Sequence, residues 1–148
     1  MKKAAIFLML FVICSCNKDK LFSKRLIRPG SWKVASLSVG GIQQTNLPQW
    51  DISDCNIYEE SCSGIWKQTN NEQATFSWQF NDKGSTFTIL RQNGADSCDF
   101  ITDQVEIQCF NYSGVYEVLE NKRDRMRFRS SQTTGFPNSK VIIELEHL

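Results

Sequence analysis

The run ATFSWQF at residues 74–80, followed directly by NDKG at residues 81–84, has the clearest structural pattern of the chain. Every second residue of the run is apolar: Ala74, Phe76, Trp78 and Phe80. Because successive side chains of a strand point to opposite faces, this period of two predicts a β-strand with one buried and one solvated face. Asn, Asp and Gly are typical of turns, so residues 81–84 predict a hairpin loop that leads into a partner strand at residues 85–91.

Strand-like runs separated by turn residues continue on both sides of this hairpin, and no useful helical periodicity follows the N-terminal leader. The predicted strands are residues 31–39, 65–68, 74–80, 85–91, 104–110, 114–119, 125–130 and 140–147. Residues 42–54, which contain Pro48 and Trp50, are expected to form a long loop. Eight consecutive strands predict an all-β fold, an eight-stranded up-and-down antiparallel barrel that holds packed side chains or one small ligand. An open sandwich is the alternative.

The last predicted hairpin also has a predicted register. A loop centred near Thr134 and Gly135 sets Phe128 opposite Val141, and Met126 opposite Ile143. The same register sets Arg125 opposite Glu144 and Arg123 near Glu146, cross-strand ion pairs worth roughly 0.2–1 kcal/mol each.

The first 16 residues have the features of an export signal. Lys2 and Lys3 precede residues 4–13, which lack charged and polar side chains, and Ser15-Cys16 follows. The apolar run is too short for a comfortable membrane span, which needs about 20 residues. With Ile13 three positions before it, Cys16 resembles the acylated cysteine of the lipobox in bacterial lipoproteins. The alternative is an ordinary cleaved signal without a lipid.

This leader defines the expected division of the chain and its location. We expect a cleaved signal peptide at residues 1–15, a lipidated tether at 16–28 with one helical turn, and a single barrel domain at 29–148. The resemblance implies palmitate-type acylation of Cys16 and a lipid anchor in the bacterial outer membrane, on its periplasmic face or at the cell surface. Cleavage removes two of 17 basic residues, and the 15 that remain against 16 acidic residues give a net charge of −1. This near-neutral balance gives no reason to expect nucleic acid as a partner, and a monomer is expected.

Four cysteines remain after Cys14 is removed and Cys16 is acylated: Cys55, Cys62, Cys98 and Cys109. An even number in an exported domain predicts two disulfides. The local pairs Cys55–Cys62 and Cys98–Cys109 are favoured, and Cys62–Cys98 is also compatible with the spacing. Zinc is a weak alternative, because no C-x2-C pair occurs and the single histidine, His147, is distant in sequence.

Gly30-Ser31-Trp32 at the start of the first predicted strand resembles the Gly-x-Trp signature of lipocalins. Residues 112–119 and 126–128 resemble the closing strands of small lipocalin-like bacterial lipoproteins. The resemblance implies a barrel whose Trp32 packs across one end. Lipocalins often carry an Arg after the last strand that stacks on this Trp, but here the last strand runs into Glu146, His147 and Leu148.

Two sets of residues are candidates for binding. Arg123, Arg125, Arg127 and Arg129 alternate, so they form either an anion site or a solvated outer face paired with Glu117, Glu144 and Glu146. The second set lines a ligand pocket if the barrel is hollow and forms the core if it is filled. Its members are Trp32, Trp50, Trp66, Trp78 and Phe128, joined by Phe76, Phe80 and Phe87. Trp50, in the long loop, is the best candidate for a residue at the barrel mouth.

Catalysis has little support in the sequence, and neither a cofactor nor a metal is expected. His147 lacks a partner for nucleophilic chemistry, and the acids near Cys55 (Asp51, Asp54, Glu59 and Glu60) fit a solvated loop better than a glycosidase pair. The expected function is therefore that of a non-enzymatic, lipid-anchored envelope protein that binds a small apolar or amphipathic ligand. The alternative is a filled barrel that binds an envelope protein, as inhibitor or assembly partner, through loops such as 42–54 and 55–62.

Overall fold

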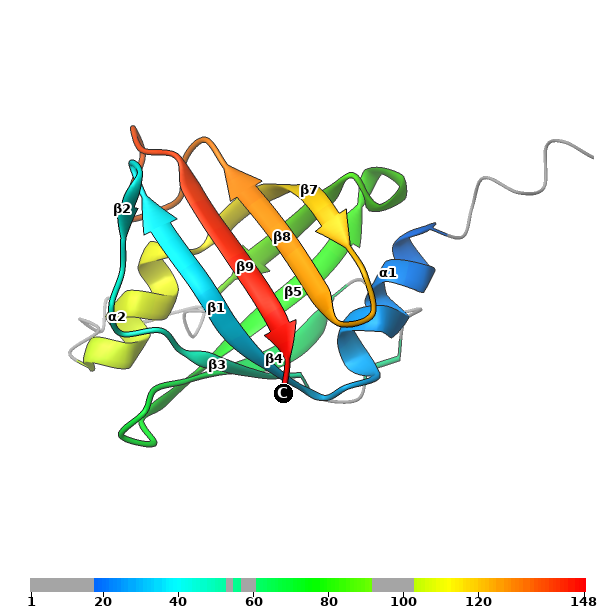
Figure 1. Ribbon diagram of the computed structural model, residues 1–148, viewed down its shortest axis with the longest axis horizontal. Helices are drawn as coiled ribbons and strands as arrows, with labels where there is room; N and C mark the ends of the chain where they lie inside the picture. The colour runs from blue at the N-terminus through cyan, green and yellow to red at the C-terminus, as the bar shows by residue number, and fades with distance from the viewer. Residues whose placement is uncertain (1–17, 53–54, 57–60, 92–102) are drawn as a thin grey trace, which may run out of the picture.

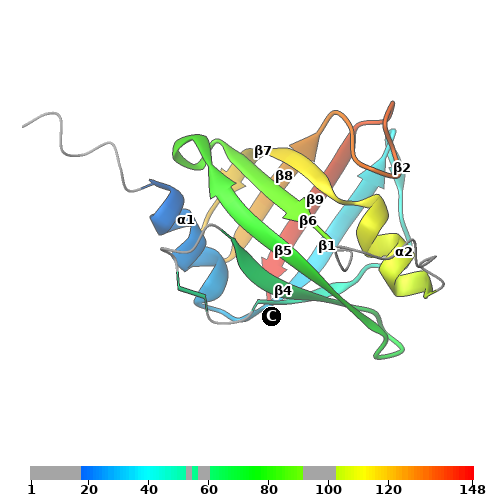
Figure 2. The ribbon, with the colours of Figure 1, turned by 180° about the vertical axis from the view of Figure 1, so that it is seen from behind.

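The computed structural model describes residues 18–52, 55–56, 61–91 and 103–148, which form a closed antiparallel β-barrel with a helix at each end (Figures 1 and 2). The elements are α1 (Lys18–Ile27), β1 (Ser31–Val39), β2 (Ile42–Gln43), β3 (Gln49–Ile52), β4 (Cys62–Lys67), β5 (Gln73–Asn81), η2 (Asp82–Gly84), β6 (Thr86–Leu90), α2 (Gln104–Asn111), β7 (Gly114–Asn121), β8 (Arg125–Ser130) and β9 (Val141–His147). The predicted all-β fold class is confirmed.

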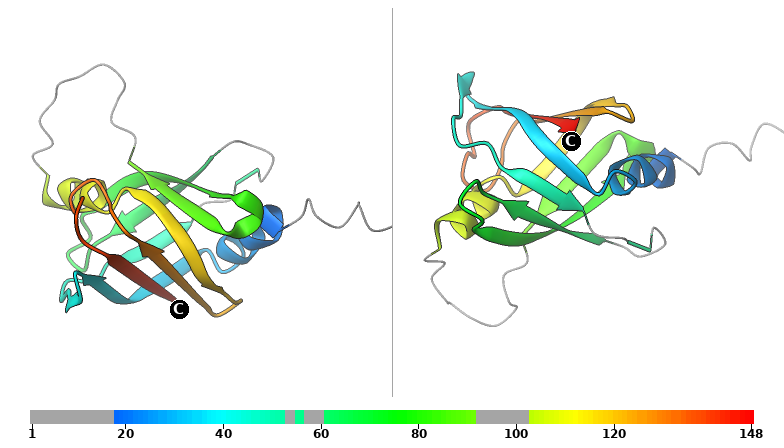
Figure 3. Two further views of the ribbon diagram at one scale, coloured as in Figure 1. Left: turned by 90° about the horizontal axis from the view of Figure 1, so that it is seen from above. Right: turned by 60° about the horizontal axis from the view of Figure 1, so that its bottom comes forward.

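The barrel wall follows the order of the chain. The eight wall strands are β1, β3, β4, β5, β6, β7, β8 and β9, each antiparallel to the next, and β9 returns to pair with β1. This last pairing runs from Trp32 opposite His147 to Val39 opposite Val141. The short β2 pairs only with the end of β1 and stands outside the ring (Figure 3). The predicted up-and-down, eight-stranded barrel is therefore correct.

One of the eight predicted strands is wrong, and a different segment takes its place. Residues 104–110 form α2, because the carboxylate of Asp103 accepts a hydrogen bond from the backbone N–H of Val105 and caps the helix. The missing strand is β3, within the predicted loop 42–54. Trp50 and Ile52 of β3 are buried, and Trp50 pairs with Trp66 of β4.

The segment expected to be a lipidated tether is folded from Lys18 onward. It forms α1, a ten-residue helix, instead of a single turn. Leu26 is fully buried, and its backbone carbonyl accepts a hydrogen bond of 2.8 Å from Nε1 of Trp32. The Phe22 ring packs edge-on against Phe80 inside the barrel wall. These contacts show that α1 is a part of the barrel structure.

The register of the last hairpin differs from the prediction by two residues. Phe128 lies opposite Ile143 instead of Val141, and Met126 lies opposite Leu145. The connecting loop, residues 131–140, is centred one position later than expected, and each such step changes the pairing by two. Because a shift of two keeps every side chain on its face, the predicted buried residues are still buried.

The interior of the barrel is packed with aromatic side chains. Phe87 lies at its centre, with ring centroids of Phe128 and Phe80 at 4.5 and 4.7 Å and those of Trp78 and Trp50 at 6.1 and 6.4 Å. The buried rings are Trp32, Trp50, Trp66, Trp78, Phe76, Phe80, Phe87, Phe128, Tyr112 and Tyr116. Burial of rings of this size is the main source of stability in such a core.

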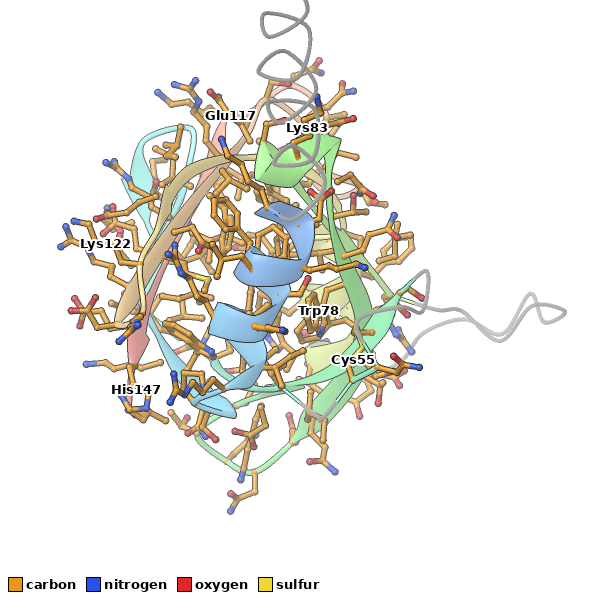
Figure 4. The ribbon with its side chains drawn as sticks, turned by 90° about the vertical axis from the view of Figure 1, so that its right-hand side faces the viewer. Cys55, Trp78, Lys83, Glu117, Lys122 and His147 are labelled. Carbon is orange, nitrogen blue, oxygen red and sulfur yellow. A yellow bond between two sulfur atoms is a disulfide. The ribbon has the colours of Figure 1, made fainter. Side chains whose placement is uncertain are left out.

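The two helices lie at opposite ends of the barrel. Figure 4 looks onto one end and shows α1 across it, with Lys83 near its first turn and His147 near its last. Figures 1 and 2 show α2 at the other end, beside β2 and the loop between β8 and β9. The barrel therefore has two chemically distinct ends.

Gly64 of β4 provides a test of how tightly the interior is filled. A Cβ at this position would lie 2.6 Å from Cζ of Phe76, a fully buried ring that also contacts Trp50. We therefore expect Gly64→Ala to lower the free energy of unfolding by about 1–3 kcal/mol, measured by urea denaturation. Ser63→Ala, at the neighbouring exposed position, is the matched control. A Gly64→Ala protein as stable as this control would contradict the packing described here.

Candidate functional site

The aromatic residues predicted to line a pocket or the barrel end are all core residues. Trp32, Trp50, Trp66 and Phe128 have no exposed surface, and Trp78 is 1% exposed. Trp32 lies at the α1 end, as the lipocalin resemblance implies, and its ring meets the ring of His147 edge-on at 6.3 Å. His147, at the end of the last strand, is therefore the residue that contacts the Trp32 ring edge-on.

Trp50 is not at the barrel mouth. It lies on β3, where its ring packs against Trp66, Phe76 and Phe87 at 5.3–6.4 Å. Its Nε1–H has no hydrogen-bond partner among the described residues. The interpretation of Trp50 as an exposed contact residue is wrong, because β3 turns it inward.

The alternating arginines of β8 form a solvated, ion-paired outer face. Arg129 pairs with Glu117, Arg127 pairs with Glu144 at 2.9 Å, and Arg125 pairs with Glu120 at 3.2 Å. Arg127 and Glu144 are direct partners in the shifted register of β8 and β9. Arg125 was expected to pair with Glu144, but its ion pair is with Glu120, which lies diagonally from it on β7. Arg123 lies in the turn before β8, outside this face.

The cysteines confirm one of the two favoured disulfides. Cys55 and Cys62 are bonded, with their Cα atoms 5.5 Å apart, which excludes the alternative pair Cys62–Cys98. Cys109 is a free, buried thiol on α2. Cys109 therefore does not form the predicted bond to Cys98. Cys98 itself lies outside the described residues. The lipidation candidate, Cys16, also lies outside the described residues.

Of the acidic candidates near Cys55, only Asp51 belongs to the described residues. The Asp51 carboxylate accepts hydrogen bonds from Ser31 Oγ at 2.8 Å and Gln49 Nε2 at 2.7 Å, so it stabilises the start of β1 and β3. Asp54, Glu59 and Glu60 lie outside the described residues. Among the residues that are described, no three His, Cys, Asp or Glu side chains are grouped to hold a metal.

A polar groove of about 680 Å³ lies at the α2 end of the barrel. It is formed by α2, the loop after β2, the turn between β4 and β5, and Phe136 of the β8–β9 loop. Seven of its side chains are amides: Gln44, Asn46, Gln68, Asn70, Gln104, Gln108 and Asn111. Glu72 is the one ionisable carboxylate among the described residues that line it.

Helix geometry places the α2 amides in this groove. Gln104, Gln108 and Asn111 follow one another at intervals of four and three, which aligns them on one face of the helix. Val105 and Cys109 lie on the face that is buried in the barrel. The amide face was missed in the sequence because residues 104–110 were read with the period of a strand.

The floor of the groove is fixed by hydrogen bonds and stacked rings. Gln108 Oε1 accepts a bond of 3.0 Å from Trp66 Nε1 and a second from Gln68 Nε2. The Tyr112 ring stacks on Trp66 at 5.4 Å with an interplanar angle of 13° and contacts Phe136 at 5.3 Å. The groove is therefore a preformed surface that rests directly on the aromatic core.

Other amides of the groove remain available to a ligand. Asn46 and Gln104 are exposed, and their side chains have no hydrogen-bond partner in the part of the chain that the structure describes. An amide offers both a donor and an acceptor, so these groups match the peptide unit of an extended chain. The arrangement supports the binding of a polar, uncharged segment.

Burial controls the chemistry of Cys109 beneath the groove. Its pKa is raised to about 12, mainly because the thiol is desolvated, while the nearby Arg91 opposes and Glu106 reinforces this effect. Arg91 and Glu106 form an ion pair of 2.8 Å beside it. Burial likewise raises the pKa of Tyr116, whose hydroxyl donates a hydrogen bond of 2.6 Å to the carbonyl of Tyr112.

No described helix has both the length and the apolar character needed to cross a membrane. No protein-family model matches the chain, and a comparison with curated proteins finds no significant match.

The raised pKa of Cys109 gives a testable reactivity. We expect iodoacetamide at pH 8 to leave Cys109 unmodified in the folded protein and to alkylate it in urea, as read by peptide mass mapping, because only the thiolate reacts. The unfolded thiol ionises first, so this group should also make the protein less stable as the pH rises from about 9 towards 12. Cys109→Ala, which lacks the group, should not show that part of the loss. Rapid alkylation of the folded protein, or a peptide bonded to Cys98, would contradict the buried free thiol.

Proposed function

We propose that the chain is a non-enzymatic, lipid-anchored binding module of the bacterial outer membrane, which holds an envelope protein in the polar groove at its α2 end. The observation that supports this most directly is the filled interior. Side chains as large as Trp50, Trp66, Phe87 and Phe128 have no exposed surface.

A small apolar ligand inside the barrel would have to displace these rings. Removal of a buried aromatic ring costs about 3–5 kcal/mol in typical cores, which a weakly bound carrier ligand would not offset. The filled interior thus favours recognition on the outside, the second of the two functions that the sequence suggested. The groove is the described surface with amide groups available for that purpose.

The expected anchor gives the groove an orientation. Helix α1 begins two residues after Cys16 and lies at the end of the barrel opposite α2 (Figure 1). An acylated Cys16 would keep the α1 end next to the bilayer, and the groove would then face away from the membrane, towards other envelope proteins.

The chemistry of the groove favours an extended polypeptide segment. Its amides can pair with the donors and acceptors of a peptide backbone, and the exposed edge of Phe136 offers an apolar contact for a side chain. The near absence of charge matches a partner recognised through its backbone, and no ionised substrate group is needed.

The anchor can be tested by metabolic labelling. We expect the full chain expressed in a Gram-negative host to incorporate labelled palmitate, and Cys16→Ala to incorporate none, because Cys16 supplies the acylated thiol. Cys62→Ala, which removes a disulfide thiol within the barrel, is the control and should keep the label. A wild-type chain without label would contradict the lipid anchor.

The groove can be tested by site-specific cross-linking in cells. A photoreactive phenylalanine placed at Gln104 should capture one defined envelope protein, whereas the same probe at Thr75, exposed on the barrel wall, should not. Asn46→Arg in the Gln104-labelled chain should reduce the product about tenfold, a loss of about 1.4 kcal/mol, because a long cationic side chain would replace an amide that is available to the partner. Equal products from both positions, or a product insensitive to Asn46→Arg, would exclude the groove as the binding surface.

A further inference from the structure

A basic hollow of about 540 Å³ lies at the opposite end of the barrel, between α1 and the turn that joins β7 to β8. We propose that this hollow binds the phosphate of an anionic phospholipid headgroup. Its described lining consists of Leu21, Lys24, Arg25, Arg28, Pro29, Arg123 and His147. Only the expected location of the ligand, in the bilayer beside Cys16, rests on the proposed function.

Helix geometry collects the charges on one side of α1. Leu21, Lys24 and Arg25 are spaced by three and four positions, which aligns them on one face of the helix. Arg28 follows the helix directly and stays next to this face, because its backbone N–H donates a hydrogen bond of 3.0 Å to the carbonyl of Lys24. A separate face carries Phe22 and Leu26 and packs onto the barrel. Because that packing fixes the rotation of the helix, the basic face is turned towards Arg123 and His147.

Arg25 is held in place without being neutralised. Its guanidinium donates to the carbonyl and to the side-chain oxygen of Asn121, at 2.7 and 3.1 Å, and lies 5.6 Å from the centre of the Phe22 ring. All three contacts are with uncharged groups. The positive charge of Arg25 is therefore held in position, and no carboxylate among the described residues pairs with it.

The remaining cations of the hollow are also free of counter-charges. In the described residues, no ion pair involves Lys24, Arg28 or Arg123, and no acidic side chain lines the hollow. The arginines of β8 differ, since each pairs with a glutamate. Four permanent cations around one hollow give a strong preference for an anion with several oxygens, and guanidinium groups fit phosphate well.

The apolar part of the lining favours a lipid as the source of the phosphate. Leu21 is 45% exposed and, with Pro29, provides carbon surface beside the cations. A phospholipid carries glycerol and acyl carbons next to its phosphate, which can contact this surface, whereas inorganic phosphate has none. The hollow also exceeds the size of a lone phosphate ion.

The experiment compares acylated protein in nanodiscs of phosphatidylcholine alone and of phosphatidylcholine with phosphatidylglycerol. The readout is the rate of acetylation of Lys24, measured by mass spectrometry of its peptide. We expect phosphatidylglycerol to slow this reaction at least fivefold. Lys83, which lies at the same barrel end but outside the hollow, is the matched control and should change little (Figure 4).

Further arms separate the proposal from its alternatives. The double variant Arg28→Gln/Arg123→Gln, at two exposed positions, should lose the protection of Lys24. Equal protection of Lys24 and Lys83 would indicate attraction to a charged surface alone and would overturn the site. Protection by inorganic phosphate in phosphatidylcholine discs, equal to that by phosphatidylglycerol, would overturn the lipid as its source.

The same samples distinguish this inference from the proposed anchor. Intact mass records whether the chain is acylated, and a chain without lipid contradicts the anchor alone. For a chain that is not acylated, binding is measured instead by sedimentation with phosphatidylglycerol vesicles. The sedimented fraction of the wild type is compared with that of the double variant. Equal sedimentation of the two, or an acylated chain whose Lys24 stays unprotected, would overturn the headgroup site.

Discussion

Pairing of β9 with β1 is the constraint on which the rest of the structure depends. It closes the sheet, so that every wall strand pairs with a neighbouring strand on each of its two sides. Closure also fixes the volume inside the ring, which must then be filled by side chains or by a ligand. This chain fills it with aromatic rings grouped around Phe87. Because the interior is used for stability, recognition has to take place on the ends or on the outer wall.

The two helices close the barrel ends with different chemistry, and this difference gives the molecule a direction. Helix α1 is attached through Leu26, Phe22 and a hydrogen bond from the Gly84 N–H to Asp19, and its other faces carry basic residues. Helix α2 inserts Val105 and Cys109 and presents amides. A helix thus covers each end of the barrel, and the result is a basic surface near the expected lipid and an amide-rich surface far from it.

Sequence patterns predicted the barrel strands well where a strand has one solvated and one buried face. Residues 31–39 and 125–130 form strands with the predicted bounds. Residues 125–130 alternate regularly, and residues 31–39 are rich in residues that favour strands and end before Gly40 and Gly41. The pattern of residues 104–110 fits both a strand and a helix. Val105, Ile107 and Cys109 alternate as in a strand, whereas Val105, Cys109 and Tyr112 have the spacing of a helix face. Asp103 and Glu106 also have the spacing of a helix capping box. Strand β3 has four residues after a proline, too few for a pattern. The groove could not be predicted, since it joins loops whose proximity depends on closure.

The arginines of residues 123–129 show that strand register determines which charges of a sequence pattern are paired. Their spacing suggests one continuous basic stripe, yet only Arg125, Arg127 and Arg129 belong to β8 and have a paired residue on a neighbouring strand. Strands β7 and β9 place glutamates there, so these three charges are largely neutralised. Arg123 precedes the ladder, and no strand residue pairs with it. It faces α1 instead, beside Lys24, Arg25 and Arg28, and none of these forms an ion pair in the part of the chain that the structure describes. A single turn residue therefore separates an ordinary solvated wall from a site suited to an anion.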